Sequence, residues 1–135
     1  MEGVTITLSP EKSESLFEDA LANAVGTGYY MTGYGIELET NDKDYTKARQ
    51  TLKDKGESPS LEDIWMQILR DGNALTFEDV EGEGDQTKVI TMKDVHEKVQ
   101  NTPMENLAAL LNEDGDAGDA DILMQTVLYG SVIFG

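Results

Sequence analysis

Alternating residues in two parts of the chain, and a pair of apolar runs in a third, predict short β-strands. Residues 4–8 and 29–39 show this period of two, and the later one ends with glutamates facing away from its apolar side. Residues 75–77 and 89–91 are apolar runs that flank a glycine-rich segment, which is typical of a β-hairpin. The sequence therefore predicts a small, mostly antiparallel sheet.

Apolar residues at helical spacing predict helices over residues 10–25 and 61–69. Ser9 is suited to the N-cap of the first helix, because its hydroxyl can accept a free backbone N–H. Ser60 followed by Asp63 resembles a capping box for the second. We expect the apolar stripe of the second helix, which includes Trp65, to lie in the core.

Three more segments complete the predicted organisation. Thr91 and the pair Thr102-Pro103 mark two further helix starts. Residues 41–56 are polar and form either a short exposed helix or a connecting insert. The acidic turn at 112–119 leads into an apolar segment that is either a helix or a strand. Together these features predict one α+β domain over residues 1–135, with four to five helices.

Composition excludes several classes of function. The 135 residues include no Cys and one His, so thiolate metal sites and multi-histidine sites within one chain are ruled out. There are 27 Asp and Glu against 10 Lys and Arg, a net charge of −17 that repels phosphate backbones. No apolar stretch reaches the ~20 residues of a membrane span, and the N-terminus lacks a secretory pattern. We therefore expect a cytoplasmic protein that contacts neither membrane nor nucleic acid directly.

The negative charge is concentrated in the second half of the chain. Residues 57–135 hold 17 acidic and four basic residues. Such runs are either solvated loops that maintain solubility or an acidic face for a basic protein partner. The candidate partner-binding carboxylates lie in two predicted turns: Glu81, Glu83 and Asp85 in one, and Asp114, Asp116 and Asp119 in the other.

Three tyrosines among glycines form a further candidate surface. Tyr29, Tyr30 and Tyr34 either pack a strand or form a recognition surface, since tyrosine is frequent at binding hot spots. The neighbouring glycines follow a helix instead of preceding one, so they are a weak signal for nucleotide binding.

Two signals for metal binding or catalysis are outweighed by structural alternatives. Residues 112–121 alternate carboxylates as a calcium loop does, but the glycine and glutamate positions of an EF-hand are not met. A helix N-cap at Asp119 or Asp121 is the stronger interpretation. His96 as a general base would need a nucleophile to activate, and the sequence contains no nucleophile motif. We expect no cofactor, no metal and no catalytic residue.

Three stretches resemble a family of small acidic proteins encoded by bacteriophages, prophages and mobile elements. They are Ala20–Tyr30, the paired segments Leu75–Val80 and Val89–Val95, and Asp119–Gly135, which ends in two aromatic-glycine steps. The polar insert at 41–56 departs from the family pattern. The resemblance implies a genomic setting and supplies no catalytic residues.

These observations support one leading hypothesis and two alternatives. The leading one is a non-enzymatic protein that binds another protein, acting as an acidic mimic that inhibits a basic or nucleic-acid-binding host factor. One alternative is self-assembly into a homo-oligomer through the apolar C-terminal segment. The other is the binding or sequestration of a small molecule or nucleotide near the tyrosines.

Overall fold

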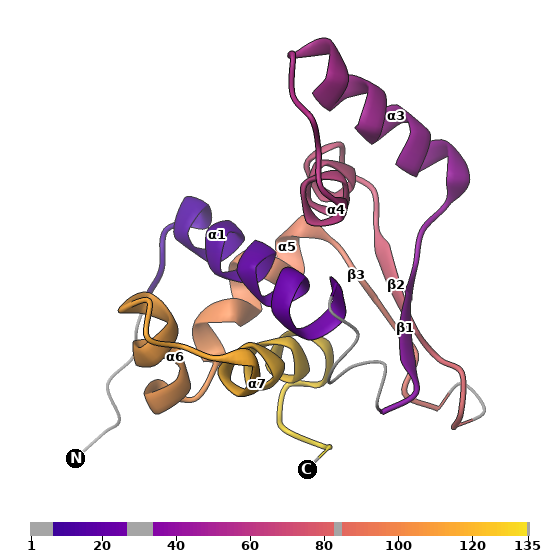
Figure 1. Ribbon diagram of the computed structural model, residues 1–135. Coiled ribbons are helices and arrows are strands. Elements are labelled where there is room, and N and C mark those ends of the chain that lie inside the picture. The colour runs from indigo at the N-terminus through magenta and orange to yellow at the C-terminus, as the bar shows by residue number, and fades with distance from the viewer. Residues whose placement is uncertain (1–6, 27–33, 83–84, 135) are drawn as a thin grey trace.

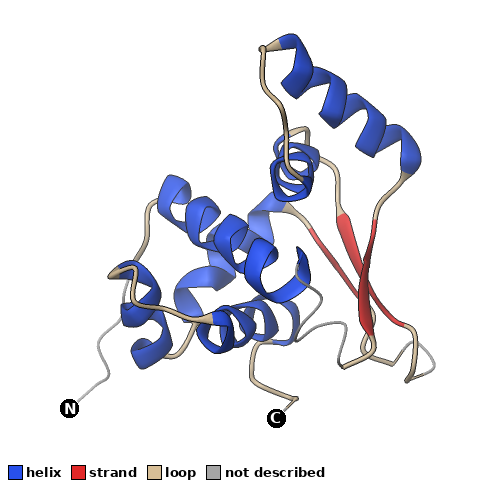
Figure 2. Ribbon diagram, viewed as in Figure 1, coloured by secondary structure: helices blue, strands red, loops and turns tan. Residues whose placement is uncertain are grey.

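The computed structural model describes residues 7–26, 34–82 and 85–134, which form helices gathered on one side of a small sheet (Figures 1 and 2). The described residues contain six α-helices and one three-stranded antiparallel sheet, so the α+β class is confirmed. The predicted number of helices was too small. Both segments left open by the sequence, residues 41–56 and the C-terminal segment, are helices.

The sheet has the order β1-β2-β3, with β1 at Ile36–Glu39, β2 at Leu75–Asp79 and β3 at Lys88–Ile90. The predicted hairpin of β2 and β3 is confirmed, with Leu75 opposite Ile90. The expected strand at 29–39 is shorter, and its residues 29–33 lie outside the described residues. The expected strand at 4–8 is not confirmed: residues 4–6 are not described, and Thr7 and Leu8 have no regular structure.

The first helix, α1 at Pro10–Ala20, begins as predicted. Ser9 Oγ accepts the backbone N–H of Lys12 at 3.1 Å. A π-helical turn, η1 at Leu21–Gly26, continues α1. Leu16 and Phe17 place the apolar face of α1 in the core.

The central helix, α4 at Leu61–Arg70, packs against α1, α3, η1 and β2. The predicted capping box is present: Ser60 Oγ accepts the N–H of Asp63, and the Asp63 carboxylate accepts the N–H of Ser60. Trp65 is buried, as expected from its apolar stripe. This helix therefore joins the sheet to the helical side of the molecule.

The polar segment 41–56 forms a helix, α3 at Asp42–Asp54, capped by Asn41. Its apolar stripe docks on α4, with Ala48 and Leu52 buried and Tyr45 partly buried. Figure 1 shows α3 at the edge of the molecule, beyond α4. Most of the other residues of the helix are exposed, which explains its polar composition.

Two short helices, α5 at Met92–Lys98 and α6 at Met104–Leu111, follow the sheet, joined by the 3₁₀ turn η2 at Val99–Asn101. Both begin where the sequence predicts. The buried Thr102 hydroxyl donates to the carbonyl of Val99, so it fastens η2 and does not cap α6.

The last helix, α7 at Ala117–Tyr129, has eight of its 13 residues buried. It begins earlier than predicted, because Asp116 is its N-cap and Asp119 lies one turn inside. Gly130 ends it in the left-handed conformation, at φ 80°. Residues 131–134 then fold back over the helix.

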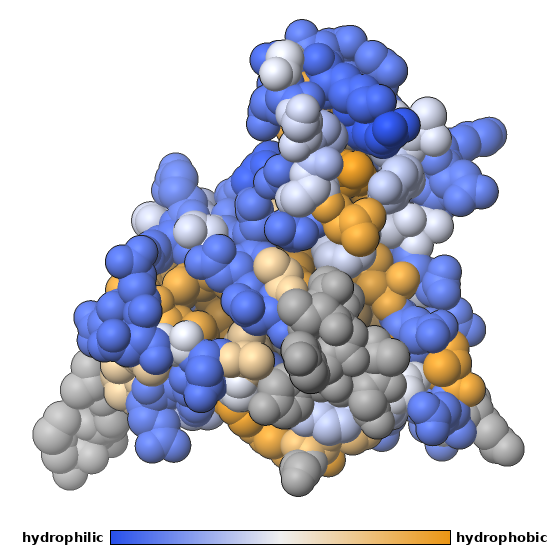
Figure 3. Space-filling view, viewed as in Figure 1, coloured by the Kyte–Doolittle hydropathy of each residue, from blue (hydrophilic) through white to orange (hydrophobic). Residues whose placement is uncertain are grey.

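The visible surface is mostly hydrophilic, with apolar atoms in separate patches (Figure 3). No helix among the described residues is long and apolar enough to cross a bilayer. Among the described residues, the exposed large hydrophobic side chains are Leu61, Val80, Val89, Met104, Val132 and Ile133.

Candidate protein-binding surface

The two predicted acidic turns lie at opposite ends of α7. Asp116 caps its first turn, and the hydroxyl of Tyr129 in its last turn donates to the carbonyl of Gln86 in the β2–β3 turn at 3.1 Å. A helix of 13 residues is about 20 Å long. The two groups of carboxylates therefore do not form a single face.

The β2–β3 turn is organised by Asp79, a carboxylate that the sequence did not single out. Asp79 accepts the backbone N–H groups of Glu81, Gly82 and Gln86, and these bonds, that of Gly82 first, lower the pKa of Asp79. A side chain at Gly82 would clash with the Asp79 carboxylate. Asp79 therefore holds Glu81 and Asp85 at the surface, where both are exposed. The candidate Glu83 lies outside the described residues.

The turn between α6 and α7 uses two of its three candidate carboxylates for structure. Asp116 accepts the N–H of Asp119, and Asp119 accepts the N–H of Asp116, both at 3.0 Å. The amide of Asn106 also donates to Asp119, and it is the main reason that the pKa of Asp119 is lowered. Asp114 is exposed. Asp116 and Asp119 are therefore primarily capping residues.

The candidate tyrosines are only partly within the described residues, since Tyr29 and Tyr30 are not. Tyr34 donates its hydroxyl to Asp121 Oδ2 at 2.8 Å and stacks on Phe134, with ring centroids 4.5 Å apart. Burial raises the pKa of Asp121, whose other oxygen has no hydrogen-bond partner among the described residues. Tyr34 therefore connects α7 to the C-terminal segment.

Gln125 holds that C-terminal segment in place. Its Oε1 accepts the backbone N–H groups of Ile133 and Phe134, each at 2.8 Å, and its Nε2 donates to Asp121. The side chain is completely buried. Most apolar residues of α7 lie in the core of the chain itself, and Val132 and Ile133 are the large apolar residues that the C-terminal segment exposes.

The sheet carries an acidic surface that sequence reasoning missed. Its outward face, opposite the core, consists of Glu37, Glu39, Thr76, Glu78 and Val89. All three glutamates are exposed, and Glu37 lies directly opposite Glu78 in the β1–β2 register. The alternation of Glu37 and Glu39 was visible in the sequence, but their pairing with Glu78 depends on the register. We call these five residues the acidic sheet face.

The acidic sheet face has no positive charge of its own. Like charges directly opposite each other destabilise a sheet. Within the described residues, ion pairs join Arg70 to Glu14, Lys93 to Glu97, and Lys98 to Asp94, all on helices. None of them reaches the sheet glutamates. Three carboxylates outside these ion pairs therefore lie on a solvent-facing surface.

A second polar cluster joins α1, α4 and α5. Glu14 accepts from Arg70 Nε at 3.2 Å and contacts His96 Nε2 at 2.9 Å. Burial, together with the hydrogen bond and charge of Asp63, raises the pKa of Glu18 to about 7. These contacts link three helices, and Glu14 is the carboxylate partner of the single histidine. A shallow hollow beside them is lined by Glu11, Glu14, Ser15, Glu18, Asp19 and Arg70.

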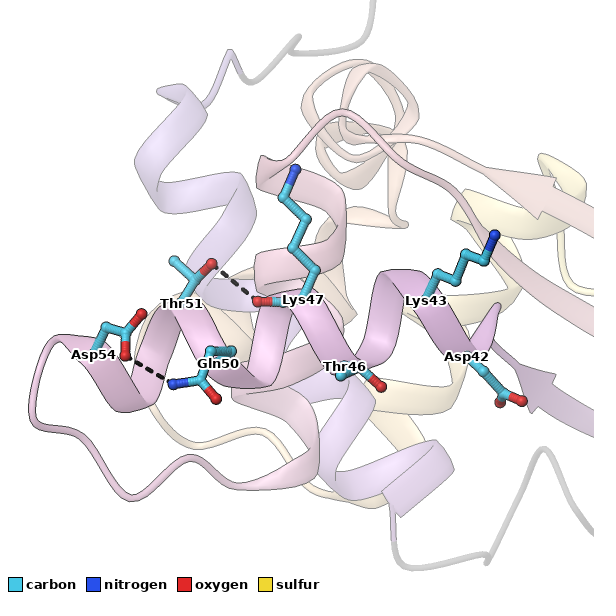
Figure 4. Close-up of a pocket in the computed structure, with 7 residues that line it drawn as sticks. All are labelled: Asp42, Lys43, Thr46, Lys47, Gln50, Thr51 and Asp54. Atoms are coloured by element: carbon cyan, nitrogen blue, oxygen red, sulfur yellow. Dashed lines mark hydrogen bonds between the residues drawn. The ribbon is translucent and has the colours of Figure 1, made fainter.

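A larger hollow follows the outward side of α3 (Figure 4). All of its lining residues come from this one helix, in two rows with a spacing of four residues, so it is a surface groove between side-chain ridges. Within one row the amide of Gln50 donates to the Asp54 carboxylate, and in the other the hydroxyl of Thr51 donates to the backbone carbonyl of Lys47. The lining residues are Asp42, Lys43, Thr46, Lys47, Gln50, Thr51 and Asp54.

No cluster of three or more metal-ligating side chains able to hold an ion occurs in the described parts of the chain. The carboxylates of residues 112–121 are divided among helix capping, the surface and the core, so they do not converge as calcium ligands would. No family model, curated protein or solved structure matches the chain.

Proposed function

We propose that the protein acts by binding a basic partner protein, and that the acidic sheet face is its principal contact surface. The observation that supports this most directly is the pairing of Glu37 with Glu78. The chain places like charges opposite each other on an exposed strand pair, at a cost in stability, with no base on that face. A basic partner would relieve this repulsion on binding.

The protein would still act as an acidic mimic, but through the acidic sheet face instead of the two acidic turns. Fixed carboxylates on a rigid sheet present a negative potential that competes with phosphates for a basic surface. The resemblance to phage-encoded proteins suggests a nucleic-acid-binding host factor as the partner. The action is one of occupancy, with no catalytic step.

The two alternatives have less support. Self-assembly through the apolar C-terminal segment would have to use Val132 and Ile133, because Leu123, Val127 and Leu128 are buried within the chain. Ligand binding near the tyrosines would have to disturb Tyr34, which already bonds Asp121 and stacks on Phe134.

The test compares two variants of equal net charge. The face variant replaces Glu37, Glu39 and Glu78 by Gln, and the control variant replaces the exposed Glu57, Glu97 and Glu105 by Gln. Each is immobilised beside the wild-type protein and exposed to a bacterial lysate, and captured proteins are challenged with duplex DNA.

We expect wild type and the control variant to retain a protein that duplex DNA displaces, and the face variant to lose it. Equal capture by both variants would overturn the proposal. Asp116 and Asp119 are avoided because their replacement would disturb the start of α7. Glu113→Gln combined with Asp114→Asn tests the α6–α7 turn separately, and we expect it to bind as wild type does.

A further inference from the structure

We propose that β1 accepts an extended basic segment of the partner as a fourth strand, with Lys or Arg at alternate positions. This inference rests on the proposed function and specifies how the acidic sheet face is recognised. Three observations carry it: the position of β1 in the sheet, the direction of its free backbone groups, and the charges beside them.

Among the described residues, β1 is an edge strand that pairs with β2 alone, so its other side is open. It is the first strand in the order β1-β2-β3, and β2 is its main packing neighbour, whereas β3 also packs against α5 and α7. Figures 1 and 2 show β3 on the side of the sheet that leads to α5. Edge strands present unpaired N–H and C=O groups to any strand that can align with them.

The ladder fixes which backbone groups of β1 are free. Val80 donates its N–H to the carbonyl of Gly35 at 2.9 Å, so these two residues form a hydrogen-bonded pair. Hydrogen-bonded and non-hydrogen-bonded pairs alternate in an antiparallel ladder, so Glu37 directs its backbone groups to β2 and Leu38 directs its groups to the open edge. Asp79, which lies opposite Ile36, follows the same alternation. Its N–H points away from β1 and donates to Thr87 Oγ1 in the segment leading to β3.

The side chains beside this edge select the charge of the added strand. Glu37 and Glu39 lie on the outward face of β1, and Glu78 lies behind them on β2. A residue placed beside β1 on the same face would have its Cβ about 4.5–5.5 Å from that of a glutamate. A second copy of β1 would bring glutamates against glutamates, whereas Lys or Arg at every second position would pair with them.

The intervening positions of the added strand would face the core side, beside Ile36 and Leu38. Leu38 is only partly buried, so an apolar residue there would cover it. The expected partner segment therefore alternates basic and apolar residues over the four positions of β1. Main-chain bonds supply affinity in such strand addition, and the side chains supply specificity.

The experiment uses an acetylated, amidated octapeptide in which four Lys alternate with four Val, and two N-methylated versions of it. One version is methylated on the Val amides and the other on the Lys amides, so charge and composition are matched. In an added strand, only one set of amide N–H groups points toward β1. These are the Val amides if the strand adds antiparallel and the Lys amides if it adds parallel. Binding is measured by calorimetry, and the exchange of the Leu38 amide by NMR.

We expect one methylated version to bind at least tenfold more weakly than the parent peptide, the other to bind as the parent does, and the Leu38 amide to exchange more slowly in the complex. If all three peptides bound equally and the Glu37, Glu39 and Glu78 replacements weakened their binding, strand addition would be overturned. The acidic sheet face would then remain as the binding surface. Binding that is equal in the face and control variants would overturn both proposals. Absence of binding at millimolar peptide would overturn strand addition, and the lysate experiment would then decide the proposed function alone.

Discussion

Neutralising Glu78 should stabilise the protein, because it removes the repulsion with Glu37 across the β1–β2 ladder. Two carboxylates about 6 Å apart in water-like surroundings repel each other by about 0.7 kcal/mol. This lies within the range of roughly 0.2–1 kcal/mol for cross-strand pairs. At physiological ionic strength the Debye length is about 8 Å, so roughly half of the repulsion should remain.

A double-mutant cycle isolates this interaction. We expect Glu78→Gln and Glu37→Gln each to raise the free energy of unfolding by about 0.7 kcal/mol at low salt. The double variant should gain little more than either single one, because a lone carboxylate has no partner left to repel. Urea denaturation at pH 7, in low and in high salt, measures all four proteins.

Glu57→Gln is the matched control, because it removes the same charge from an exposed residue outside the sheet. If it stabilised the protein as much as Glu78→Gln, the effect would reflect net charge and not the cross-strand pair. Additive gains from the two sheet variants would likewise refute the reasoning. A stabilised variant that also loses the partner would show that these glutamates are kept for binding at the expense of stability.

Three further predictions concern other parts of the molecule. The pKa of Glu18 is about 7 in the folded protein, above its ordinary 4.5, so the folded state binds the proton more tightly than the unfolded state does. The free energy of unfolding should therefore fall as pH rises from about 4.5 to 7, by on the order of 1 kcal/mol after solvent screening. Glu18→Gln should flatten this slope in urea titrations across that range. Gln125→Ala should cost about 2–4 kcal/mol, since it leaves two backbone N–H groups of the C-terminal segment without their acceptor, and hydrogen exchange at Ile133 and Phe134 should accelerate, whereas unchanged exchange would contradict the clamp. Gly82→Ala should disturb the β2–β3 turn, because its Cβ would meet the Asp79 carboxylate, and NMR shifts confined to residues near Asp79 would confirm it.

Local patterns in the sequence determined most of the secondary structure. The caps at Ser9 and Ser60 depend on residues three positions apart, the hairpin on two consecutive strands joined by one turn, and the burial of Trp65 on one helix face. The stripe of Tyr45, Ala48 and Leu52 also marked the buried side of α3. Such features are set by backbone geometry and by the partition of apolar side chains, so they can be predicted without knowing what packs against them.

The candidate surface, in contrast, was decided by tertiary structure. The acidic turns looked equivalent in the sequence, yet α7 separates them and helix capping uses Asp116 and Asp119. For Tyr34 the sequence left strand packing and a recognition surface as alternatives, and the fold brings it to Asp121 and Phe134. The opposition of Glu37 and Glu78 joins residues that are distant along the chain. Strand register and the choice of the open edge follow from packing across the whole core, which no local pattern encodes.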